Sequence, residues 1–324
     1  MNVSYKGLRW LGLAAIFALA GCWVGTRDLG VWQDAVIYDA YYAMGAELPL
    51  GEIANKTDSL FYLIIRAWSE SGGAKDGLWM LLGAVTVCLT CLALFRATTR
   101  PLVAVLTYAS FLLWVQAYTQ IRMSLAFAFC LASFYLVGRS LVLRVLLQVA
   151  ACLTHISLLV VVVLHVLSRR FSPAPRVVFV WAFAAATSIF IFSSFVLPVL
   201  PFEKVAVYYQ LLSEGAHSKI NILSALPAIQ VCALIAMAFS RGAAKQLATV
   251  EYKLALLGAI SFYALSAVPV FAVRINELLS IFFIIVISRV VRTNWAIFSL
   301  WLLYLAFSVK SAVVLLTTEL AKHG

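Results

Sequence analysis

The sequence has few charged residues. Only 11% of its 324 residues are charged, whereas 64% are hydrophobic. A soluble domain carries about 25% charged and about 45–50% apolar residues. A surface so poor in charge could not be solvated, so the composition excludes a water-soluble protein and predicts a membrane protein.

The sequence also has no cluster of basic residues, and it has no pair of CxxC motifs. Lys and Arg outnumber Asp and Glu by 24 to 13, but they are scattered through short loops between apolar runs. Nucleic-acid binding needs a basic cluster, so we expect no nucleic-acid partner. All six cysteines lie in apolar stretches, and Cys88 and Cys91 form a CxxC without a second ligand pair. We therefore predict no disulfide and no metal site.

Long apolar runs fill most of the chain. At roughly 20 residues per crossing, they predict an all-α, polytopic integral membrane protein with about eleven transmembrane helices in a single domain over residues 1–324. The runs lie near 8–25, 78–95, 102–118, 122–138, 141–154, 156–168, 177–197, 221–239, 252–269, 274–290 and 295–316.

The distribution of Lys and Arg predicts the orientation in the membrane, because cationic loops face the cytoplasm. If Met1 lies in the cytoplasm and successive loops alternate between the two sides of the membrane, fourteen of the 24 Lys and Arg residues fall on the inner side. Glu251 is the only acidic residue on that side. We therefore expect a cytoplasmic N-terminus.

Two outer segments, 26–77 and 198–220, are long enough to form caps. Within the first, residues 60–65 predict a short interfacial helix. Residues 19–22, with the sequence LAGC, resemble a bacterial lipoprotein cleavage box. A first transmembrane helix with small residues is the interpretation that we favour, and Cys22 would lie on the outer side in both cases.

Residues 141–168 could form one long helix, but Arg144 and Arg169 would then lie on opposite sides of the membrane. A hairpin that turns near His155 keeps both of them inside. Each arm would have about 14 residues and a length of about 21 Å, which is shorter than a bilayer core of about 30 Å. We therefore expect His155 at the bottom of a recess below the outer surface.

Ionisable groups at membrane depth are expensive and usually mark function. Arg122, Arg274 and His155 each lie at the start of a predicted helix that runs inward from the outer side. Helix N-termini carry unpaired N–H groups and a positive dipole end, and two guanidinium groups there make a strong anion site. We predict that the three side chains meet in one recess, where arginines and no metal neutralise a phosphate or pyrophosphate.

Each of these residues also has a structural alternative. Arg274 could simply pair with Glu277 at i+3. Arg122 could extend to the outer headgroups, and His155 could be a neutral packing residue.

Asp39 lies among aromatic residues in the first outer segment, within the stretch VIYDAYY. We expect a partly buried setting, which makes a carboxylate a better proton acceptor and would suit a general base for a sugar hydroxyl. A solvated acid in a loop is the alternative. Further candidates for lining the same cavity are Tyr38, Tyr42, Gln120, Asp58 and Arg66.

Four short motifs resemble those of EpsG-type, Wzy-like polysaccharide polymerases, in the same order and spacing. Residues 121–126, IRMSLA, resemble the family's I-R-Q-x-L-A helix start, and residues 154–158, THISL, resemble its F-H-x-S-x-L turn. Residues 274–279, RINELL, resemble its late arginine helix, and residues 38–42, YDAYY, resemble its early D-x-x-x-Y loop. The sequence departs from the family at Met123, Thr154 and residues 57–61, where TDSLF takes the place of an E-P-G-F stretch.

The resemblance implies a GT-C-like glycosyltransferase of the bacterial inner membrane. Such an enzyme polymerises undecaprenyl-pyrophosphate-linked repeat units at the periplasmic face, for O-antigen or exopolysaccharide, without a cofactor. Membrane lipids and a chain-length regulator protein are the other partners that it implies. In this interpretation Arg122 and Arg274 stabilise the leaving pyrophosphate, His155 orients it or acts as acid or base, Asp39 is the base, and Glu277 contacts substrate.

Three other functions stay open at this point. An O-antigen-ligase-like enzyme would use the same donor with a different acceptor. A membrane acyltransferase would also use an intramembrane histidine, but the neighbours of His155 offer no acidic partner. A flippase or transporter would need polar residues through both leaflets, whereas the predicted inner leaflet is almost purely apolar.

Overall fold

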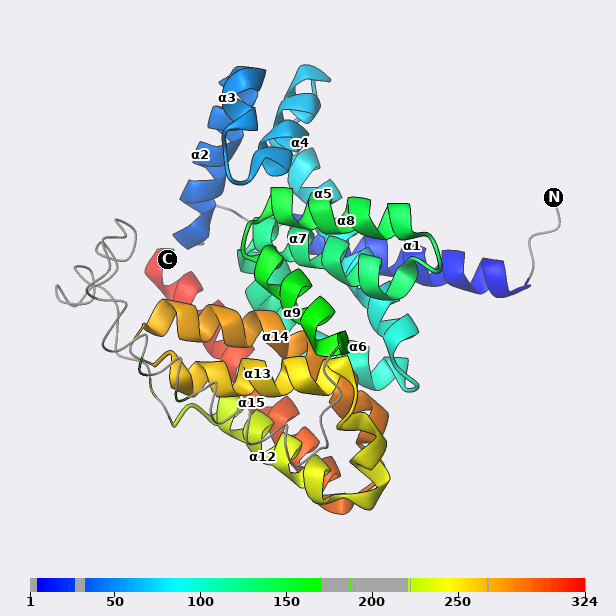
Figure 1. Ribbon diagram of the computed structural model, residues 1–324. Coiled ribbons are helices and arrows are strands. Elements are labelled where there is room, and N and C mark those ends of the chain that lie inside the picture. The colour runs from blue at the N-terminus through cyan, green and yellow to red at the C-terminus, as the bar shows by residue number, and fades with distance from the viewer. Residues whose placement is uncertain are drawn as a thin grey trace. The chain divides into compact units, whose positions relative to one another are not determined.

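The computed structural model describes residues 5–26, 33–170, 221, 223–266 and 268–323, together with the single positions 187 and 191. Within this part of the chain every regular element is a helix, so the all-α prediction is confirmed (Figure 1). The predicted outer cap 198–220 and, apart from the two single positions, the apolar run 177–197 lie outside the described residues.

The chain forms two compact units. The first unit comprises residues 1–163 and 308–324, and the second comprises residues 164–307.

Among the described helices, three are long and apolar enough to cross a membrane. They are α5 (Lys75–Ala97), α14 (Pro269–Val290) and the Trp295–Thr318 part of α15 (Trp295–His323). Helices α6 (Pro101–Ser110) and η2 (Leu113–Thr119) would make a fourth span that is bent by 65°. These helices support an integral membrane protein, whereas the count of eleven spans stays a prediction.

In the first unit, α1 (Tyr5–Gly25) packs along α5 through glycines. A Cβ atom added at Gly21 would lie 2.4 Å from the carbonyl oxygen of Gly83, and one added at Gly25 would lie 2.4 Å from the Cα of Met80. Small residues four positions apart let two membrane helices approach this closely. The small residues near Cys22 therefore have a packing role inside a continuous helix, as the transmembrane interpretation expects.

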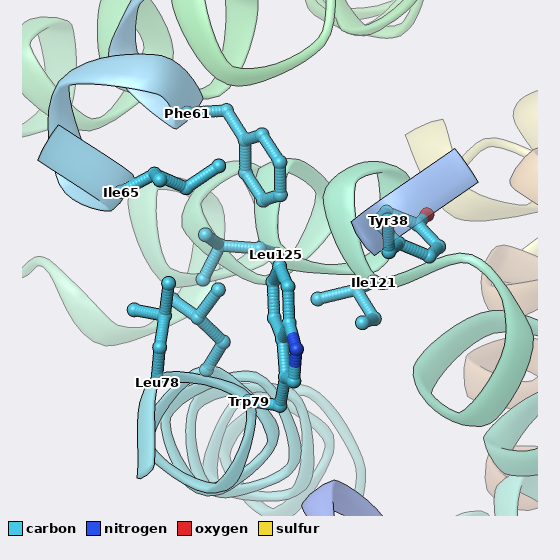
Figure 2. Close-up of a cluster of buried hydrophobic side chains, with 8 residues drawn as sticks. Tyr38, Phe61, Ile65, Leu78, Trp79, Ile121 and Leu125 are labelled. Carbon is cyan, nitrogen blue, oxygen red and sulfur yellow. The ribbon is translucent and has the colours of Figure 1, made fainter. Parts of the chain in front are cut away.

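Within the predicted first outer segment, residues 33–70 form three helices that lie together in Figure 1. They are α2 (Gln33–Glu47), α3 (Leu50–Ala54) and α4 (Ser59–Glu70), so the helix predicted at 60–65 is confirmed. Apolar residues on one face of α4, including Phe61 and Ile65, are fully buried. Figure 2 shows them in a cluster with Tyr38 from α2, Trp79 from α5 and Leu125 from α7 (Ile121–Leu131).

Helix α7 lies between two stretches of wider π-helix. These are η2 before it and η3 (Ala132–Leu136) after it. Helix α8 (Leu141–Thr154) then ends one residue before His155, and α9 (Leu158–Arg170) begins three residues after it. The break predicted at His155 is confirmed, and a single continuous helix over 141–168 is not formed.

In the second unit, α13 (Val250–Ala264) packs along α14, with α12 (Ala225–Phe239) and the 3-10 turn η6 (Arg241–Gln246) beside them. A buried polar network crosses these helices. The Asn276 side-chain amide donates to Gln230 Oε1 at 2.9 Å and to the Gly258 carbonyl at 3.2 Å. Gln230 Nε2 in turn donates to Ser280 Oγ at 2.8 Å. Buried amides need such partners, so the network joins α12, α13 and α14.

Candidate functional site

Helix α7 begins abruptly and places Arg122 in its first turn. Gln120 ends η2 in a non-helical conformation, with φ −116° and ψ 61°, and α7 starts at the next residue. The backbone N–H of Arg122, which has no partner within the helix at this position, donates to the Tyr38 hydroxyl at 3.4 Å. The Arg122 side chain is only 20% exposed.

Asp58 is the partner of this arginine. Arg122 Nη1 donates to Asp58 Oδ2 at 2.5 Å, and the aspartate side chain is only 12% exposed. Its other oxygen, Oδ1, is buried and has no hydrogen-bond partner among the residues that the structure describes. A paired and partly buried guanidinium favours a role inside the protein over extension to the lipid headgroups.

An aromatic ring covers the guanidinium group. Arg122 Cζ lies 4.6 Å above the centre of the Tyr41 ring, which is within the range of a cation–π contact. Tyr62 packs edge-on against Tyr41 at 5.7 Å. Burial, followed by the negative potential of Tyr41, raises the pKa of Tyr62. The Tyr62 hydroxyl therefore keeps its proton at neutral pH and can serve as a hydrogen-bond donor.

The wall beside this ion pair is built of aromatic rings from three elements. Tyr38 packs against Phe61 at 6.4 Å and against Trp79 at 5.9 Å. Tyr42 also contacts Trp79, at 6.2 Å, and donates its hydroxyl to the Gly73 carbonyl. The structure thus brings the candidates Tyr38 and Asp58 to Arg122, and Tyr42 contacts Trp79, the same ring that Tyr38 contacts.

Two aromatic residues of this group were not among the sequence candidates. Tyr41 lies three residues after Tyr38, and Tyr62 lies four residues after Asp58. Positions three or four apart share a helix face, so the spacing within α2 could have indicated Tyr41. Only the packing of α4 on α2 brings Tyr62 to the same place.

The predicted buried setting of Asp39 is wrong. The Asp39 side chain is 49% exposed and pairs with Lys75 Nζ at 2.9 Å. Successive residues of an α-helix are turned by about 100°, and α2 directs Tyr38 into the core, so its neighbour faces outward.

Arg66 is held by partners of its own. Its Nε bonds Glu70 Oε1 at 2.6 Å, and its Nη1 donates to the Leu48 carbonyl. Arg66 thereby links α4 to the end of α2.

His155 occupies the break between α8 and α9. Its Nδ1 lies 2.8 Å from Ser157 Oγ and accepts the backbone N–H of Ser157 at 3.3 Å. The imidazole is therefore oriented by its own turn, with a half-buried ring.

Arg274 is the sixth residue of α14, in the second unit. Its predicted place at the start of the helix is therefore wrong, because α14 begins at Pro269. Its Nη1 lies 3.7 Å from Glu277 Oε2, so the i+3 ion pair that the sequence allowed is formed. The Arg274 side chain remains 44% exposed, whereas that of Glu277 is 13% exposed. Because Arg122 and Arg274 belong to different units, their predicted meeting in one recess stays a prediction.

Potential metal ligands are sparse in this chain. Over the described ranges, no group of three or more His, Cys, Asp or Glu residues is close enough to hold a metal ion. The polar groups that the structure does bring together are cationic, carboxylate and phenolic, a set suited to binding anions and sugars.

Apolar helices and a partly buried arginine at a helix start define the class: an all-helical membrane protein with ionised groups inside its helical region. The chain belongs to the EpsG family, whose model matches residues 10–320, nearly the whole chain. EpsG is a Wzy-like polysaccharide polymerase family, so the predicted family is confirmed. No curated protein and no solved structure matches the chain significantly.

Proposed function

We propose that this protein polymerises lipid-linked oligosaccharide repeat units in the bacterial inner membrane. The growing glycan would be transferred as a block from undecaprenyl pyrophosphate to a sugar hydroxyl of the incoming lipid-linked unit. The observation that carries the proposal is Arg122, a partly buried arginine at a helix start in a member of a polysaccharide polymerase family.

The leaving group explains why arginines are needed. When the glycosidic C–O bond to pyrophosphate breaks, its electron pair stays on a phosphate oxygen, and negative charge builds up there. A guanidinium group neutralises that charge with two parallel N–H donors, and its effect is larger in a site that excludes water. Arg122 and Arg274 would share this role, so the reaction would need no metal ion.

The remaining parts of the site fit a glycan substrate. The partly buried rings of Tyr41 and Tyr42 would contact the apolar sides of sugar rings, with the buried Tyr38 packed behind them. His155, oriented by Ser157, would hold the pyrophosphate or exchange a proton with it. The charge distribution favours the periplasmic side for these groups, where a chain-length regulator protein would also act.

Complementation of a strain that lacks its own copy of this gene tests the proposal. We expect Arg122→Ala and Arg274→Ala each to abolish long-chain glycan at normal protein levels, because loss of one charge-stabilising donor costs about 10²–10³ in rate. Arg122→Lys keeps the charge but loses the paired donors, and should restore little.

Arg96→Ala is the matched control. Arg96 lies in the last turn of α5, is exposed, and should be replaceable without effect. Wild-type chain length in either the Arg122→Ala or the Arg274→Ala strain would refute the proposed role of the arginines.

A further inference from the structure

Asp58 occupies a position where its side chain would ordinarily serve the helix that it begins. Aspartate before the first turn usually accepts a hydrogen bond from a backbone N–H of that turn. Here the Asp58 side chain makes no such bond. It reaches instead to Arg122, 64 residues further along the chain, and is only 12% exposed. The carboxylate is thus directed to the arginine at the expense of its own helix.

We propose that Asp58, and not Asp39, is the general base of the transfer, and that Arg122 covers it until donor pyrophosphate draws the guanidinium away. This inference rests on the proposed function and assigns the acceptor side of the same site. It makes the Asp58–Arg122 ion pair a resting state that the donor opens.

Competition between two anions supplies the physical reason. In the structure one guanidinium faces one carboxylate, through Nη1 and Oδ2. A pyrophosphate carries more charge and offers oxygens for two parallel N–H donors, so it competes well for the arginine. When the guanidinium moves to the pyrophosphate, Asp58 Oδ2 loses its hydrogen-bond donor and can accept one from the acceptor hydroxyl. Donor binding would therefore create the base at the moment when the acceptor needs it.

The surroundings of Asp58 suit an acceptor hydroxyl. Asp58 Oδ1 is buried without a hydrogen-bond partner in the described part of the chain. Tyr62 lies near enough to Asp58 and Arg122 to be influenced by the charges of both. An acceptor hydroxyl that donates to this carboxylate would satisfy an oxygen that lacks a partner in the resting protein. Asp39, by contrast, is half exposed and pairs with Lys75.

The step balances without a co-reactant. The acceptor hydroxyl gives its proton to Asp58, and its oxygen forms the new C–O bond to the anomeric carbon of the donor. The bond from that carbon to the pyrophosphate oxygen breaks, and its electron pair leaves with the pyrophosphate. Asp58 then passes the proton to solvent or to the departing lipid pyrophosphate, and Arg122 can return to it.

The test separates proton transfer from anion binding. Purified Asp58→Asn protein is titrated with farnesyl diphosphate, a short isoprenyl diphosphate, and the same variant is assayed for long-chain glycan in the complemented strain. We expect glycan formation to fall about 100-fold or more, as for loss of a general base. Diphosphate binding should be equal to or tighter than wild type, because the competing carboxylate is gone. Asp58→Glu should recover part of the activity, and Asp39→Asn should behave as wild type.

A second measurement uses the unaltered protein, in case the Asp58 variants fail to fold. Dicyclohexylcarbodiimide reacts with carboxyl groups in apolar settings, and farnesyl diphosphate should increase its labelling of Asp58, but not of Asp39, several-fold. Long-chain glycan made by Asp58→Asn, joint loss of glycan and diphosphate binding in that variant, or labelling of Asp58 that diphosphate does not increase would each overturn the inference. Retained glycan in Arg122→Ala would instead refute the proposed function itself.

Discussion

Replacing Gly21 by alanine would place a methyl group where α1 and α5 touch through their backbones. The new Cβ would lie 2.4 Å from the Gly83 carbonyl oxygen and 2.6 Å from the Cα of Ala84. Both atoms belong to the backbone, so no side chain can rotate away. Relief of the clash requires the two helices to separate by about 1 Å, because carbon atoms pack favourably at about 3.5–4 Å.

The cost follows from the contacts that this separation weakens. Overpacking of a well-packed interface costs about 1–3 kcal/mol, and in a helical domain of this size each kcal/mol lowers the melting temperature by a few degrees, about 2–4 °C. We therefore expect Gly21→Ala to lower the unfolding midpoint of the detergent-solubilised protein by several degrees. Static light scattering or dye-free fluorescence during heating measures the midpoint.

Gly12→Ala is the matched control, since Gly12 lies in the same helix and has nothing within 4 Å of an added Cβ. Alanine favours a helix over glycine by about 1 kcal/mol, so this control should be neutral or slightly stabilising. Equal unfolding midpoints for Gly21→Ala and Gly12→Ala would refute the close packing of α1 on α5 at Gly21.

Three further perturbations have defined outcomes. Asn276→Leu removes the hydrogen bonds to Gln230 and Gly258 and should lower the free energy of unfolding by about 1–2 kcal/mol. In thermal unfolding, the double variant with Gln230→Leu should lose less stability than the sum of the two single variants. Strict additivity would contradict the network. Glu251→Gln removes the 3.1 Å ion pair with Arg289 and should lower thermal stability by about 2 kcal/mol, while the exposed Glu52→Gln serves as control. Excess EDTA should leave the rate of glycan polymerisation in membrane vesicles unchanged, because we assign charge neutralisation to arginines; activity lost to EDTA and restored by a divalent cation would refute that assignment.

Much of the fold could be predicted because the signals were local. Continuous apolar runs predicted helices, and the cationic residues flanking 141–168 predicted the break at His155, which the structure confirms. The i+3 spacing predicted the contact of Arg274 with Glu277. Each of these predictions needed only neighbouring residues and the thickness of a bilayer.

The contacts within the site could not be predicted in the same way. The Arg122–Asp58 pair joins residues 64 positions apart. Helical periodicity does not indicate which of several distant Asp or Glu residues pairs with an arginine. Asp39 looked more suitable because its neighbours in sequence are aromatic. Those neighbours turn inward on α2 while Asp39 turns outward, so the same rings that suggested burial do not cover it.

The π-helical segments on either side of α7 indicate where relatives of this protein can differ in length. A π-helical turn holds one more residue than the α-helical turn that it replaces, and it arises readily by a single insertion. Segments η2 and η3 are therefore the places where relatives should gain or lose one residue without a shift in the helix between them. An alignment that allows no gap in η2 or η3 would misplace Arg122 by one position. An alignment that allows a gap in these segments keeps Arg122 correctly aligned.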